Sequence, residues 1–168
     1  MEKNSSKLTI IRDNTFLFTA IWSDSAFWFW RASLGSELLD LLERDVETIR
    51  ARMTDEYVFL TVLIGEKRDP PSDEARKRMS EILKQSSSRL VARAIVIESE
   101  GFTATVSRGA ITDIEVGSQR RKSAYQVFRS VREATGWLAQ SLGRDQSWAS
   151  EFNKVVTEQR ARLGQGPA

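Results

Sequence analysis

Residues 58–64 read VFLTVLI, and residues 90–97 read LVARAIVI. Both runs are almost wholly apolar, which indicates strands that are buried on both of their faces. An amphipathic helix is predicted on each side of the first run, at 34–53 and at 72–85. This alternation of helices and buried strands predicts a parallel or mixed sheet that is flanked by helices.

The segment before the first helix predicts an antiparallel meander. Its apolar residues recur at every second position, as expected of strands that have one apolar face. Strands are expected at 8–11, 15–22 and 26–32, with polar turns at 13–14 and 23–25 between them.

After the second buried run, the pattern continues with a helix, a short strand and two more helices. Ser130 and Glu133 have the spacing of a capping box, so a helix is expected to begin there, and Gly143 can close it. For the earlier helices, Ser72 is the expected cap of the second, and Ser33 or Ser36 of the first. The expected elements of this part are a helix at 102–116, a strand at 124–128, a helix from 131, and an amphipathic helix at 146–163.

These elements predict one α/β domain with a C-terminal addition. The mixed sheet opens with the antiparallel meander and continues with alternating helix–strand units. The expected organisation is a disordered N-terminus at 1–6, the α/β domain at 7–143, an appended helix at 144–163 and a tail at 164–168.

The composition excludes much catalytic chemistry. The chain has 168 residues, of which 40% are hydrophobic and 29% are charged, as is typical of a globular domain. It has no cysteine and no histidine, which excludes thiol nucleophiles, histidine-dependent triads and the usual zinc sites. No calcium-loop spacing and no glycine-rich phosphate loop is present. We therefore expect no enzyme, no catalytic residues, no metal and no cofactor.

Charge and hydropathy bear on location and partners. The formal net charge is +2, and the densest basic cluster, at 120–122, is interpreted as a solvated loop. We therefore expect no nucleic-acid partner. No apolar run approaches the roughly 18 residues of a membrane span, and no secretory signal follows Met1. These features predict a cytoplasmic protein without a transmembrane segment.

Residues 127–138 read VFRSVREATGWL, which fits the pattern V-F-x-[SD]-x-x-E-A-x-x-W-L. That pattern is typical of the closing strand and helix of the bacterial STAS-like family, whose founding members are anti-sigma-factor antagonists. The strand at 94–97, followed by Glu100, Gly101 and Phe102, lies where the SpoIIAA-like branch has a similar strand and helix start. Residues 58–142 therefore resemble this branch, which is grouped with the lipid-carrying Sec14 fold. The first 57 residues match only in layout.

The resemblance implies a mixed sheet of four or five strands with helices mainly on one side. It also implies a non-enzymatic role, usually protein–protein regulation. In the anti-sigma antagonists, a phosphorylatable serine lies in an Asp-x-Ser-Gly motif where a helix begins. Ser72 lies at that place, but the motif and its glycine are absent. The residues favour a helix cap at Ser72, and a phosphorylation site is the alternative.

An aromatic run, FWFW at 27–30, is the most unusual local feature. On a strand, its two tryptophans share one face and its two phenylalanines share the other, so both faces need cover. The last helix, a second subunit or partner protein, and an apolar ligand are the three alternatives. The candidate residues for this partner or apolar-ligand surface are Phe27, Trp28, Phe29, Trp30, Trp148 and Phe152.

Arg93 interrupts the second buried run. It is either a strand-edge residue with its head in solvent or a buried charge that is paired with Glu66 or Glu98.

From these features we expect a non-catalytic regulatory or scaffolding module that acts by protein–protein binding. A homodimer through the opening meander or the last helix is compatible with this function. The first alternative is a carrier or sensor of a small apolar, lipid-like ligand. The second is an enzyme that uses carboxylates alone, such as Glu98 and Glu100.

Overall fold

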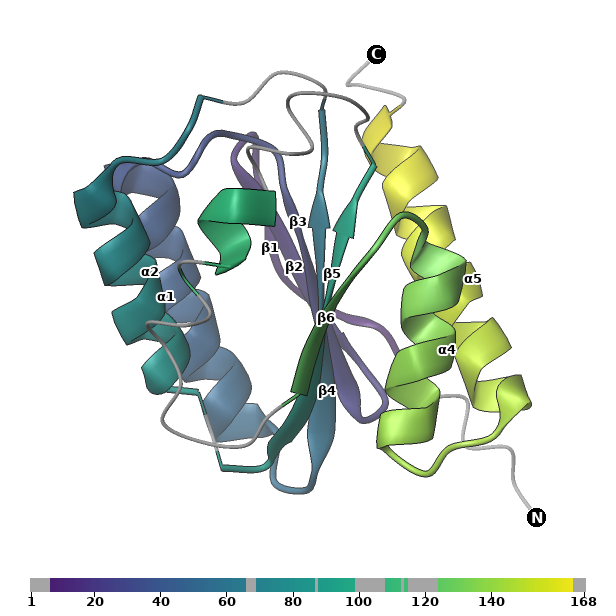
Figure 1. Ribbon diagram of the computed structural model, residues 1–168. Coiled ribbons are helices and arrows are strands. Elements are labelled where there is room, and N and C mark those ends of the chain that lie inside the picture. Colours follow the sequence, from purple (N-terminus) through teal and green to yellow (C-terminus); the bar gives the residue numbers. More distant parts are fainter. Residues whose placement is uncertain are drawn as a thin grey trace.

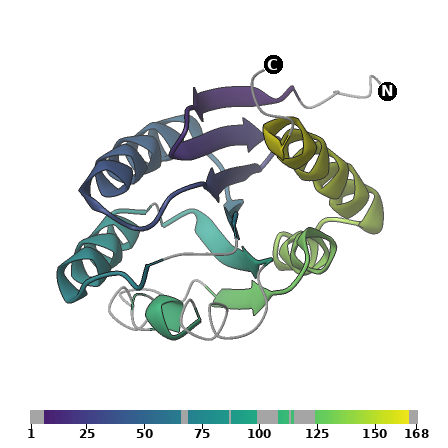
Figure 2. The ribbon, with the colours of Figure 1, turned by 90° about the horizontal axis from the view of Figure 1, so that it is seen from above.

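One six-stranded sheet lies between two layers of helices in the computed structural model of the chain (Figures 1 and 2). The structure describes residues 7–65, 69–86, 88–98, 108–112, 114 and 124–164. The strands follow one another across the sheet in chain order, from β1 to β6. This arrangement confirms the α/β fold class with a mixed sheet.

The first three strands form the expected antiparallel meander. They are β1 (Thr9–Asp13), β2 (Leu17–Trp22) and β3 (Ser25–Trp30). Ser23 adopts a positive φ of 52° in the tight turn between β2 and β3. A β-bulge between Ile10 and Arg12 interrupts the pairing of β1, which is an edge strand of the sheet.

The next three strands run parallel to β3 and to one another. They are β4 (Tyr57–Leu63), β5 (Leu90–Ile97) and β6 (Ala124–Phe128). The helices α1 (Ser36–Arg52) and α2 (Asp73–Lys84) form the first two connections. Because parallel crossovers are right-handed and the strands advance in one direction, these connections lie on the same face (Figure 2).

The opposite face of the sheet is covered by the last two helices, α4 (Val131–Ser141) and α5 (Gln146–Gly164) (Figure 1). Residues of both helices are buried with apolar side chains of the sheet. The C-terminal helix is therefore part of the layer that closes this face.

Two of the helix caps agree with the sequence. Ser72 Oγ accepts a hydrogen bond from the Ala75 amide at 3.1 Å, and Ser130 Oγ accepts one from the Glu133 amide at 3.3 Å. The prediction for the first helix was wrong, because the residue before α1 is Gly35 and no side chain caps it.

Two further expectations differ from the structure. The resemblance implied four or five strands with helices mainly on one side, whereas the sheet has six strands and helices on both sides. The reason is that the meander adds strands at one edge, and α4 and α5 return over the second face. Of the helix expected at 102–116, residues 108–112 and 114 are helical, and the rest of that range lies outside the described residues.

Candidate functional site

The aromatic residues of β3 divide between the two faces of the sheet. Trp28 and Trp30 belong to the core beside α1 and α2, while Phe27 and Phe29 belong to the core beside α4 and α5. Strand alternation explains this division. All four side chains are buried, so helices of the same chain supply the cover that the sequence required.

On the α4–α5 face, Phe152 provides the contact with β3. Its ring centroid lies 5.9 Å from that of Phe27 and 5.6 Å from that of Trp22, against which it stacks. Trp148 is half-buried beside Trp22, at 5.6 Å between the ring centroids. Five of the six candidate aromatics are therefore buried within the chain, and the sixth, Trp148, is partly exposed.

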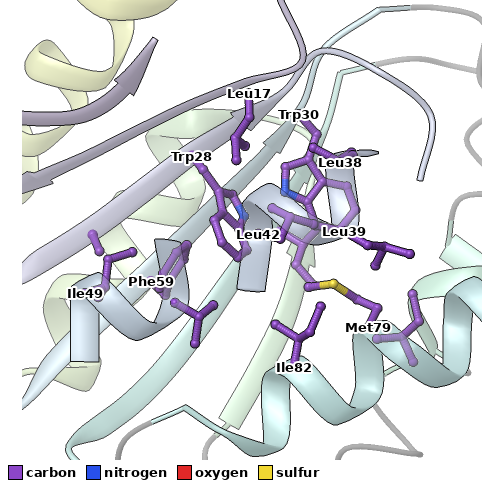
Figure 3. Close-up of a cluster of buried hydrophobic side chains, with 14 of the residues drawn as sticks. Leu17, Trp28, Trp30, Leu38, Leu39, Leu42, Ile49, Phe59, Met79 and Ile82 are labelled. Atoms are coloured by element: carbon purple, nitrogen blue, oxygen red, sulfur yellow. The ribbon is translucent and has the colours of Figure 1, made fainter. Parts of the chain in front are cut away.

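On the other face, a pocket lies between the sheet and the helices, and we call it the indole pocket. Figure 3 shows Trp28 and Trp30 among the apolar side chains that α1 and α2 direct toward the sheet. Most of the lining side chains are apolar. They are Trp28, Trp30, Val46, Phe59, Thr61, Leu63, Met79, Leu83, Ser86, Leu90, Arg93, Ile95, Ile111 and Ile114.

The aromatic wall of the indole pocket is fixed by specific contacts. Trp28 Nε1 donates a hydrogen bond to Thr61 Oγ1 at 2.7 Å, which satisfies the indole N–H inside the core. The Phe59 ring meets Trp28 edge-on, with the centroids 4.5 Å apart, and the Trp30 ring lies 6.0 Å from Trp28. Edge-to-face contacts of this kind stabilise a defined ring arrangement.

The open space in the indole pocket is small. Its volume is about 40 Å³, and a neighbouring gap of about 50 Å³ shares several of its walls. For comparison, an apolar cavity that holds benzene measures roughly 150 Å³. The shared walls are Trp30, Leu63, Ile111 and Ile114.

The outer wall of the pocket comes from the short helical segment beside α2 (the unlabelled green helix in Figure 1). Ile111 and Ile114 of this segment are buried against the core of the α1–α2 face. Ser80 of α2 donates a hydrogen bond to the Ile114 carbonyl at 2.8 Å. This bond ties the outer wall to α2.

Among the described lining residues, Arg93 alone carries a charge. It lies in the middle of β5, in register with Phe59 of β4 on one side and Tyr125 of β6 on the other. Of the two partners that the sequence suggested, Glu98 pairs with Arg160 of α5 at 2.9 Å, and Glu66 lies outside the described residues. Arg93 is half-buried in this position.

A separate, polar cleft lies at the amino ends of the parallel strands, and Asp24 and Arg144 are among its walls. Arg144 Nε donates to Asp24 Oδ2 at 2.9 Å, and the Ser23 hydroxyl donates to the other carboxylate oxygen. Partial burial acts to raise the pKa of Asp24, but the hydrogen bonds from Ser23 and Arg144 outweigh it and lower the pKa below its ordinary value. The carboxylate is thus ionised at neutral pH, which suits an ion pair better than a general base.

Ser72 is exposed at the start of α2, where its hydroxyl serves as the cap. A phosphorylation site at Ser72 stays a prediction. Within the part of the chain that the structure describes, no three carboxylates gather closely enough to hold a metal ion. No helix in the same ranges combines the length and apolar character required to cross a membrane.

Sequence reasoning missed a buried charge network on the α1 side of the sheet. Asp45 accepts a hydrogen bond from Arg12 Nη2 at 2.8 Å and another from the Thr19 hydroxyl at 2.6 Å. A signal was present, because Asp45 follows Leu38 by two helical turns and so lies on the apolar stripe of α1.

Comparisons with protein-family models, with curated proteins and with solved structures found no match to this chain. The function is therefore inferred from the site itself.

Proposed function

We propose that the protein is a non-catalytic binding module that holds a small apolar ligand in the indole pocket. The observation that supports this function is the pocket wall of Trp28, Trp30 and Phe59, which encloses space on the α1–α2 face. Aromatic and aliphatic walls bind a ligand by removing its apolar surface from water. The resemblance to a family that is grouped with lipid carriers points in the same direction.

The position of the pocket also favours ligand binding. Trp30 and Leu63 are the last residues of β3 and β4, and both line the indole pocket and the neighbouring gap. In open α/β sheets, ligands bind outside the carboxyl ends of the strands. The neighbouring gap therefore lies toward this end of the sheet, and the indole pocket extends from it beneath the helices as far as Leu90, the first residue of β5.

The size of the open space limits the ligand. Gaps of about 40 and 50 Å³ do not admit a ring, so an unbranched chain of a few carbons is the best fit. The unbranched side chain of Met79, which lines the pocket, can change rotamer to admit such a chain.

The five tryptophans provide a direct test by NMR. In a ¹⁵N-labelled sample, each indole N–H gives one signal, and single Trp→Phe variants assign them. Titration with hexan-1-ol is expected to shift the signals of Trp28 and Trp30. The signals of Trp137 and Trp148, which belong to the opposite face, are expected to stay in place. Equal shifts at all five positions, or none at any, would contradict the proposed function.

A matched pair of variants sharpens the test. Leu83→Phe adds volume at the pocket wall, whereas Val155→Phe adds it to another half-buried aliphatic position, on the far face. We expect Leu83→Phe to weaken hexan-1-ol binding at least about tenfold, because the added ring fills the gap. Val155→Phe is expected to leave the affinity unchanged within about twofold, and equal effects would exclude the indole pocket as the site.

A second candidate function, protein–protein binding, is favoured by the opening hairpin. Among the described residues, the exposed large hydrophobic side chains are Ile10, with 46% exposure, and Phe16, with 37%. Ile10 lies on the edge strand β1, where the β-bulge disfavours pairing with another strand, and Phe16 lies in the turn between β1 and β2. A side-chain contact with a second copy of the chain fits this edge.

Native mass spectrometry of the purified protein separates the two functions. A mass of twice 19.1 kDa that Ile10→Lys returns to the single value would support the second copy. Extra mass that is lost on denaturation would support a retained ligand. A bare single chain under all conditions would exclude a second copy of the chain as the partner.

A further inference from the structure

The two edge strands of the sheet differ in their ability to pair with a further strand. β1 carries the β-bulge between Ile10 and Arg12, and it ends in a charged residue, Asp13. β6 contains no charged residue and no proline, and its register with β5 has no bulge. Charges, prolines and bulges are features by which natural edge strands avoid pairing with other chains. Of the two edges, β6 is therefore the one suited to strand pairing.

The side chains of β6 are exposed or half-buried. Among the described strands, β6 has a neighbour on one side alone, and Figure 1 shows it in front of the other strands. Ala124 and Gln126 are exposed, while Tyr125, Val127 and Phe128 are half-buried. A further strand at this edge would remove the remaining apolar surface of these side chains from water.

Helix α4 extends the same surface beside β6. Trp137 of α4 is half-buried, and its ring centroid lies 5.6 Å from that of Phe128. Trp137 also lines a hollow on the surface of α4, together with Arg132 and Glu133. These two charged residues are exposed neighbours, so the surface carries both signs of charge. A surface of this kind is complementary to a second copy of itself, because a twofold axis can bring opposite charges together.

We infer that β6 pairs with β6 of a second copy of the chain, in antiparallel orientation about a twofold axis at Gln126. In this register, Tyr125 of each copy lies opposite Val127 of the other. Ala124 likewise lies opposite Phe128, so each aromatic ring meets a smaller apolar side chain across the strands. The result is one continuous sheet that runs through both copies.

The size of the interface requires α4 as well. A strand of five residues is too short to bury the roughly 800 Å² per partner that a stable dimer needs. A twofold axis perpendicular to the sheet places both copies of α4 on the same face, where Trp137 adds the large aromatic contact that is typical of interface centres. The strand thus sets the register, and the helix supplies buried area.

The test introduces a charge at the proposed axis. Because Gln126 is exposed, Gln126→Lys and Gln126→Glu leave the core of each chain unchanged, but each places two like charges directly opposite one another in the dimer. Sedimentation equilibrium is expected to give twice 19.1 kDa for the wild type and a Kd at least about tenfold weaker for each variant. An equal mixture of the two variants is expected to restore the doubled mass, because opposite charges then meet.

Two controls and a spectroscopic signal locate the contact. Gln85→Lys, the same substitution at an exposed position after α2, should leave the Kd within about twofold, and so should Ile10→Lys at the other edge. On dilution from dimer to monomer, the indole signal of Trp137 is expected to shift. The signal of Trp28, which is buried on the opposite face of the sheet, is expected to stay in place.

Three results would overturn the inference. The first is a wild type that remains at 19.1 kDa up to a concentration of about 1 mM. The second is a dimer that Ile10→Lys dissociates and Gln126→Lys does not, since it places the second copy at β1. The third is a mixture of the two Gln126 variants that stays dissociated, because the strands then do not meet at this residue. Ligand binding in the indole pocket is tested separately and does not depend on these outcomes.

Discussion

Asp45 carries the most deeply buried charge of the described ion pairs, with only 1% of its side chain exposed. Asp45 lies on α1, and its carboxylate accepts hydrogen bonds from two side chains of other elements, Arg12 of β1 and Thr19 of β2. These hydrogen bonds compensate for the loss of water around the charge. The network therefore joins the edge strand to the first helix at the level of single residues.

Replacement of Asp45 by Asn tests this network. Arg12 would lose its ionic partner. Because the pair is buried on the Asp45 side but 25% of the Arg12 side chain is exposed, we expect a loss at the lower end of the range for buried pairs, about 3 kcal/mol in the free energy of unfolding. Asp40→Asn on the same helix is the matched control, because Asp40 pairs with Arg78 at an exposed site. That change is expected to cost less than about 1 kcal/mol. Urea unfolding measures both, and equal losses would contradict the role given to burial.

At the scale of the element, two glycines in and after α4 have different effects on the stability of the helix. Gly136 lies within the helix, where the absence of a side chain lowers helix propensity. Gly143 follows the helix with a positive φ of 67°, the conformation that glycine adopts most easily. A Cβ atom added at either position would meet no atom within 4 Å. Backbone conformation is therefore what separates the two sites.

The same substitution should consequently have opposite effects at the two glycines. Gly136→Ala is expected to raise the free energy of unfolding by about 0.5–1 kcal/mol, because it favours the helix. Gly143→Ala is expected to lower it by about 1–2 kcal/mol, because alanine is strained at positive φ. Thermal unfolding of both variants checks the signs. A gain in stability for Gly143→Ala would show that α4 does not end in this conformation.

At the scale of the whole molecule, the last helix completes the second core. Phe152 and Val156 of α5 are fully buried against the sheet, and Arg162 lies over the Phe18 ring at 5.5 Å. Ion pairs at 3.0 and 2.9 Å join Arg162 to Asp13 and Arg160 to Glu98. The C-terminal residues thus stabilise both the opening hairpin and the end of β5.

Truncation of Phe152 tests whether α5 packs on its own chain. Phe152→Ala is expected to cost about 3–5 kcal/mol, because it leaves a cavity between α5 and the sheet. Phe16→Ala, at an exposed phenylalanine, is the matched control and should cost less than about 1 kcal/mol. Chemical unfolding gives both values at two protein concentrations. A concentration-dependent loss at Phe152 would instead place α5 on a neighbouring molecule.

Local pattern in the sequence determined the elements. β5 and β6 have the predicted bounds, and the meander, the Ser72 cap and the helix that begins after Ser130 were all predicted. These features depend on neighbouring residues alone, since periodicity, turn chemistry and capping act over a few positions. The alternation in β3 also showed that both faces needed cover.

The tertiary structure decided what supplies that cover. Which helix lies over Trp28, and which over Phe27, depends on the strand order and on the handedness of the crossovers. The partners of charged groups were also decided there, because Arg12 and Asp45 are 33 positions apart and Arg160 and Glu98 are 62. The indole pocket has the same origin, since its volume is the space that side chains from three strands and three helical segments leave between them. The sequence specifies which faces of the elements are apolar, whereas only tertiary packing decides which side chains contact those faces.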